Sequence, residues 1–185
     1  MTLLVLGVLL WAVPHLFKRI APDMRAQMGD KARLVVTVCS VLALVLMTVG
    51  YRSAEFISIY TPMAGMGHLN NLLMLVSVYM FGVSGTKGVL YPITRHPMLL
   101  GTVIWAGSHL LVNGDVASLI LFGGMGLWAL LSIVAINRSS VWVAPTNGRG
   151  IKGDAMNIVG VLVLYGLIAM IHLWLGHSPF VGTYP

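Results

Sequence analysis

The fold is decided by a long uncharged stretch near the start of the chain. Residues 34–50 read LVVTVCSVLALVLMTVG and contain no charged side chain. About 17 to 25 consecutive apolar residues allow a helix to cross the hydrocarbon core of a bilayer. The stretch therefore predicts a transmembrane helix.

Further apolar stretches follow the same pattern. They cover residues 2–17, 68–85, 97–112, 116–136 and 155–175. Of the 185 residues, 58% are hydrophobic and 9% are charged, whereas soluble domains carry roughly a quarter charged residues. We therefore expect a single all-α, polytopic membrane helix bundle over residues 1–185, with about six transmembrane helices joined by short connections.

Local signals indicate where several helices begin and end. The pair Pro14-His15 predicts the end of the first helix, and Gly82 and Gly85 predict that the third helix breaks up there. Asp115 is well placed to cap the helix that begins at the next residue, because its carboxylate can accept from free backbone N–H groups.

The basic residues lie on one side of the predicted bundle. If the N-terminus faces outward, the inner connections hold ten of the eleven lysines and arginines, and the outer side holds Arg52. This bias predicts a multi-pass protein of the bacterial inner membrane with both termini in the periplasm. No groove-forming domain presents these cations, so we expect membrane lipid as a partner and no nucleic acid. The inner residues are Lys18, Arg19, Arg25, Lys31, Arg33, Lys87, Arg95, Arg138, Arg149 and Lys152.

Acidic and thiol side chains offer little chemistry within the spans. The five carboxylates lie in loops or at helix ends, which argues against a proton relay through the bilayer. The single cysteine, Cys39, falls within a span and has no second cysteine to form a disulfide.

Histidine is the unusual residue in the apolar helices. His15, His109 and His172 lie within or at the ends of spans, where a polar ring is unfavourable unless it is hydrogen-bonded or bound to a metal. Two imidazoles from different helices can hold a haem iron. Trp105 lies one turn before His109 and Gly101 is nearby, so a flat macrocycle has an aromatic wall and small neighbours. The alternative interpretation is ordinary helix packing.

A set of motifs at defined positions points to a family. The central block is Thr94-Arg95-His96-Pro97, Gly101, Trp105, His109-Leu110 and Asn113-Gly114-Asp115. The opening adds His15, Met24-Arg25, Gly29 and Gly50-Tyr51-Arg52. Together these motifs, over about residues 3–138, resemble the NnrU family of membrane proteins.

The resemblance implies a cofactor and a pair of ligands. The family is similar to the plant enzyme 15-cis-zeta-carotene isomerase, which holds haem b, and by that resemblance the ligands are His15 and His109. The cysteine that takes part in a ligand switch in the isomerase is replaced here by Ala106. The resemblance implies redox or gas-ligand chemistry, or isomerisation of a membrane-soluble polyene. Bacterial members of the family are associated with denitrification.

The predicted topology conflicts with that ligand pair. His15 lies at the inner end of its helix, close to Lys18, whereas His109 lies twelve residues after Pro97. At 1.5 Å per residue their depths differ by roughly 15 Å, whereas axial nitrogens on one iron are about 4 Å apart. His172 is predicted near the depth of His109 and is the alternative partner.

Two other functions remain open from the sequence. The Arg-His-Pro run also resembles lipid-directed methyltransferases, in which Arg95 and His96 would help bind S-adenosylmethionine. Those enzymes use paired glutamates further along the chain, and residues 114–185 contain no glutamate. The remaining alternative is a non-enzymatic membrane subunit that assembles or regulates a respiratory complex.

Overall fold

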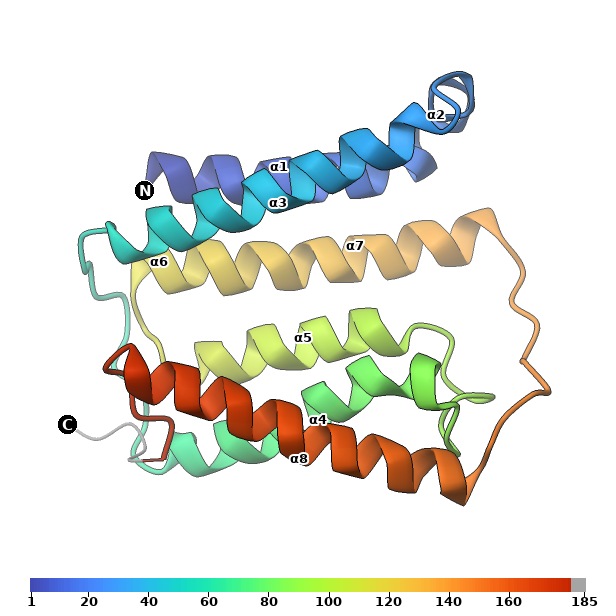
Figure 1. Cartoon of the computed structure of the whole chain (residues 1–185). Helices are drawn as coiled ribbons and strands as arrows, with labels where there is room; N and C mark the ends of the chain where they lie inside the picture. The colour runs from blue at the N-terminus through green and yellow to red at the C-terminus, as the bar shows by residue number, and fades with distance from the viewer. Residues whose placement is uncertain (181–185) are drawn as a thin grey trace.

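The structure, a computed structural model, describes residues 1–180 as a bundle of helices (Figure 1). The all-α class predicted from the sequence is therefore confirmed. Helices α6, η1 and α7 follow one another without a break, and η1 is a short π-helical segment. The elements are α1 (Thr2–Ile20), α2 (Pro22–Gln27), α3 (Lys31–Arg52), α4 (Met66–Thr86), α5 (Pro97–Leu110), α6 (Val116–Ser118), η1 (Leu119–Gly123), α7 (Gly124–Ser139) and α8 (Ile151–Trp174).

Five helices of the described chain are long and apolar enough to cross a membrane: α1, α3, α4, the continuous helix Val116–Ser139 and α8. The predicted span at residues 97–112 is the exception. Its helix, α5, has 14 residues and is about 21 Å long, against about 30 Å of hydrocarbon. It packs against α4 on one side and α7 on the other. Neighbouring helices therefore contact this short element, which carries the chain from one end of the bundle toward the other (Figure 1).

Two predicted helix ends are wrong. Helix α1 continues through Pro14 and His15, and α4 continues through Gly82. In a bilayer no water competes for the backbone groups, so proline and glycine are tolerated within a helix. The α4 helix instead ends after Thr86, where Lys87 adopts a left-handed conformation with φ 59°.

The predicted cap at Asp115 is confirmed. Its carboxylate accepts a hydrogen bond from the backbone N of Ser118 at 3.0 Å and a second from the Ser118 hydroxyl at 2.5 Å. The hydroxyls of Tyr51 and Ser118 also lie 2.8 Å apart, which links the end of α3 to this turn.

Helices α1 and α3 form a close pair that packs on α7. Glycines permit this approach, because a Cβ at Gly50 would meet the Leu4 backbone and one at Gly7 would lie 2.7 Å from the Met47 backbone N. On the other side of α7, α4 packs with α5 and α8. The bundle thus has two groups of helices joined through α7.

The two ends of the bundle differ in charge. Figure 1 shows that α1 begins and α8 finishes at the same end, while the α1–α3, α4–α5 and α7–α8 connections lie at the other. These connections and the adjoining helix ends carry the ten basic residues predicted to lie inside. The end of the bundle with these residues is called the basic end below.

At the basic end, a partly exposed network of hydrogen bonds joins α8 to α4 and to the residues after it. Asp154 accepts a hydrogen bond from the Tyr79 hydroxyl at 2.5 Å and from the backbone N of Val89 at 3.1 Å. Three residues further along α8, the Asn157 side chain donates to the Tyr79 carbonyl at 2.9 Å. We call these four residues the Asp154 clamp.

Candidate functional site

A cavity of about 550 Å³ lies between α4, α5, η1 and α8. This volume falls within the roughly 300 to 1,000 Å³ typical of ligand pockets. The wall is mainly apolar, with Met74, Val78, Leu121 and Ile168 among its residues. The cavity lies toward the end of the bundle opposite the basic end, since it includes the last turn of α5 and the last turns of α8.

Two of the three histidines singled out from the sequence line this cavity. They are His109 on α5 and His172 on α8. Each ring nitrogen Nδ1 is hydrogen-bonded to a carbonyl one turn earlier in its own helix, at 2.9 Å for His109 and 2.8 Å for His172. A carbonyl can only accept, so each Nδ1 carries a proton, and in the neutral ring Nε2 then has the lone pair that can bind a metal. Metal-bound histidines commonly have this arrangement, in which a backbone carbonyl orients the ring.

His109 is held in an aromatic wall. Its ring stacks on Phe122 with centroids 4.4 Å apart and lies 5.3 Å from the ring of Trp105. Trp105 and Phe122 also line the cavity. Phe122 belongs to the π-helical segment η1, an irregularity frequent at functional sites. Sequence reasoning missed Phe122, because its position depends on this turn.

An asparagine pair at the start of α4 adds polar groups to the wall. The Oδ1 atom of Asn70 is buried and has no hydrogen-bond partner among residues 1–180. Such an atom is unfavourable by about 1 to 3 kcal/mol, and a ligand that donates a hydrogen bond would satisfy it. Asn71 donates to the Pro179 carbonyl at 2.8 Å and so holds the segment after α8 against the cavity. Two adjacent asparagines in an apolar helix were the sequence signal available for this feature.

His15 is in a different environment. Its ring stacks on Trp11 at 4.6 Å and meets the edge of Trp128 at 5.4 Å, and it does not line the cavity. Trp128 follows Phe122, the neighbour of His109, by six residues, or about 9 Å along the helix. This separation is smaller than the roughly 15 Å predicted between His15 and His109. It is still larger than the distance of about 4 Å between two nitrogens that bind one iron.

The remaining residues predicted to bind a cofactor serve helix packing. Arg95 donates to the carbonyl and hydroxyl oxygens of Ser140, both at 2.8 Å. His96 Nε2 lies 2.8 Å from the Asn137 side-chain oxygen. These bonds join the start of α5 to the end of α7 and its following residue.

Gly101 lies at the contact between α5 and α4. Its carbonyl accepts a hydrogen bond from the Ser77 hydroxyl at 2.8 Å, and a Cβ at this position would lie 3.2 Å from the Phe81 ring. Gly101, Arg95 and His96 are all outside the cavity wall.

These features define a polytopic helical membrane protein with a ligand-sized cavity between its helices. The sequence profile of the NnrU protein family matches residues 3–179, and the chain belongs to this family. The match extends past the segment that carried the resemblance and takes in α8 with His172. No curated protein and no solved structure matches the chain.

Proposed function

We propose that this protein binds haem b in the cavity, with His109 and His172 as the two axial ligands. One observation carries the proposal: two histidines from different helices line one apolar cavity, each with Nδ1 bonded to a carbonyl and Nε2 left with a lone pair. Residues 1–180 contain no group of three or more histidine, cysteine, aspartate or glutamate side chains placed to hold a metal ion. A haem iron takes its equatorial ligands from the macrocycle, so two histidines suffice.

The chain contributes position and environment to this chemistry. Trp105 and Phe122 supply aromatic faces beside His109, and most of the cavity wall is apolar. When bound, haem supplies one-electron redox and gas-ligand chemistry. The proposed reaction class is therefore redox chemistry; gas-ligand chemistry would require one of the two histidines to give up its position. The association with denitrification rests on the family. The apolar wall also supports a small hydrophobic substrate, such as a membrane-soluble polyene that undergoes isomerisation.

An absorption spectrum tests haem binding. Protein purified in mild detergent from haem-replete cells should show a Soret band, which His109→Ala and His172→Ala should each lower or shift as an axial ligand is lost. His68→Ala is the matched control, because this histidine is exposed and outside the cavity wall. Colourless protein would overturn the proposal.

The same spectra distinguish the proposed ligand pair, His109 and His172, from the pair His15 and His109 that the family resemblance implies. We expect His15→Ala to leave the Soret band unchanged, since His15 is outside the cavity. Free imidazole should restore the spectrum of His172→Gly by occupying the vacated position. A spectrum altered by His15→Ala and unchanged by His172→Ala would replace our pair with the one that the family resemblance implies.

We further propose that the basic end faces the cytoplasm of a bacterial cell. The support is the positive-inside rule applied to the ten basic residues there. In a Cys39→Ala background, a membrane-impermeant maleimide applied to intact spheroplasts should label Glu55→Cys and spare Arg149→Cys. The reverse labelling would invert the topology.

A further inference from the structure

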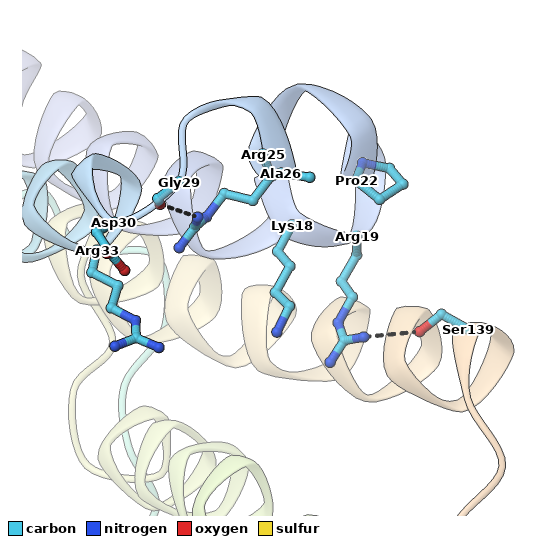
Figure 2. A pocket seen from close by; sticks show the side chains of 9 residues that line it. All are labelled: Lys18, Arg19, Pro22, Arg25, Ala26, Gly29, Asp30, Arg33 and Ser139. Atoms are coloured by element: carbon cyan, nitrogen blue, oxygen red, sulfur yellow. Dashed lines mark hydrogen bonds between the residues drawn. The ribbon is translucent and has the colours of Figure 1, made fainter.

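A second hollow, separate from the cavity, lies at the basic end. It has a volume of about 570 Å³ and is bounded by the end of α1, by α2, by the start of α3 and by the end of α7. Its charged side chains are four cations and one carboxylate, that of Asp30 (Figure 2). We call it the basic pocket, and its cations are Lys18, Arg19, Arg25 and Arg33.

The four cations of the basic pocket outnumber its one carboxylate, and none of them forms an ion pair within residues 1–180. Arg19 donates to the Ser139 hydroxyl at 3.2 Å, and Arg25 donates to the Gly29 carbonyl at 3.4 Å. Both acceptors are neutral. Among residues 1–180 no carboxylate lies within 4.0 Å of any of the four cations, and the side chains of Lys18 and Arg33 have no hydrogen-bond partner. The pocket therefore favours an anion with several acceptor oxygens.

The cations of the basic pocket come from three helices, α1, α2 and α3. Figure 2 shows Lys18 and Arg19 extending from the end of α1 toward α7, with Arg33 extending from α3 toward the same side. Guanidinium groups bind phosphate oxygens through paired hydrogen bonds, and a lysine ammonium adds a point charge. This set of donors matches a phosphate group.

Exposed apolar side chains place the pocket at the level of lipid headgroups. Ile20, the last residue of α1, and Met24, in α2, are 75% and 60% exposed, and both helices border the pocket. Leu34, the residue after Arg33, is 66% exposed. Apolar side chains beside cations are typical of a segment that lies in the membrane interface, with its cations at the headgroups.

We propose that the basic pocket binds the phosphate group of an anionic phospholipid. Basic pockets between transmembrane helices commonly bind such headgroups, and each lysine or arginine near an anionic surface contributes about 1 kcal/mol. The lipid would hold the α1–α3 pair to α7 at a point where the protein itself supplies the bond from Arg19 to Ser139. The proposal is independent of the cofactor in the cavity.

Native mass spectrometry of the full-length protein in a neutral detergent tests this inference. Phosphatidylglycerol should bind more tightly than phosphatidylcholine, and inorganic phosphate should compete poorly because it lacks the acyl chains. Replacing Lys18 and Arg33 together by glutamine should weaken phosphatidylglycerol binding about 25-fold, or roughly fivefold for each charge.

The matched control removes the same number of charges from the same end of the molecule. The double variant Arg149→Gln, Lys152→Gln lies outside the pocket and should bind phosphatidylglycerol like the parent protein. A second variant, Lys18→Arg with Arg33→Lys, keeps both charges and should retain binding within a few-fold. Equal binding of the two lipids, an equal loss in the control, or loss in the charge-retaining variant would overturn the proposal. Competition by inorganic phosphate at matched concentration would overturn the lipid as the ligand.

Discussion

The Asp154 clamp makes a sharp prediction about stability. Tyr79→Phe removes the hydroxyl that donates to Asp154 at 2.5 Å and leaves the shape of the ring unchanged. Hydrogen bonds between helices in membrane bundles contribute about 0.6 kcal/mol on average and at most about 1.7 kcal/mol. The short distance and the charged acceptor put this bond near the top of that range. Val89 still donates to Asp154 in the variant, so the carboxylate is not left without a hydrogen-bond partner. We therefore expect the free energy of unfolding to fall by about 1.5 kcal/mol, the contribution of the Tyr79 bond alone.

A double-mutant cycle measures this bond directly. Reversible unfolding in detergent micelles, followed by circular dichroism, would compare Tyr79→Phe, Asp154→Ala and the double variant. We expect a coupling energy of about 1 to 1.7 kcal/mol. Tyr91→Phe is the control, because the Tyr91 hydroxyl has no hydrogen-bond partner in the described part of the chain. A coupling below about 0.5 kcal/mol, the scatter between independent sites, would refute the reasoning.

Three further predictions use the same unfolding measurement. Gly50→Val should destabilise the protein by about 1 to 3 kcal/mol, because its Cβ would meet the backbone of α1; Gly160→Val, with open space around its Cβ, should change stability by less than about 0.5 kcal/mol. Asp115→Ala removes a helix cap and should cost about 0.5 to 2 kcal/mol, whereas Asp23→Ala loses the same charge with no such bond and should be near neutral. Burial, and then the nearby Asp115 carboxylate, raise the pKa of Tyr60 above 10.0. The folded protein therefore keeps this proton at a pH where the unfolded chain releases it. Stability should fall as the pH rises above 10, and Tyr60→Phe should make that fall shallower. An unchanged alkaline slope in Tyr60→Phe, or equal effects within either matched pair, would contradict these expectations.

The apolar runs were sufficient to predict the helices and most of the spans. They did not predict the length of α5, because residues 111 and 112 are still apolar after the helix ends. That end is stabilised from a distance: the Tyr60 hydroxyl, on the α3–α4 connection, donates to the carbonyls of Leu110 and Asn113. Tyr60 and Leu110 are 50 residues apart, so this hydrogen bond cannot be predicted from the local sequence around α5.

For the candidate site, the sequence singled out the histidines of the apolar helices and left their pairing open. The unfavourable burial of a polar ring singled out His109 and His172, and the structure brings both to one cavity. Which faces of α5 and α8 line the cavity depends on the rotation of each helix, which an almost uniformly apolar surface does not encode. Gly101 shows the same limit, because the sequence did not predict its contact with Ser77 and Phe81 of α4.

The Asp154 clamp also governs geometry at the far end of α8. His172 is 18 residues beyond Asp154 and therefore about 27 Å away along the helix axis. A pivot of about 5° at the clamp would move the imidazole by roughly 2 Å, as much as a whole metal–nitrogen bond. Helix α8 thus connects the Asp154 clamp at the charged end with the imidazole near its other end. A change in the tilt of α8 at the clamp would therefore alter the distance between His109 and His172, although the clamp touches neither histidine.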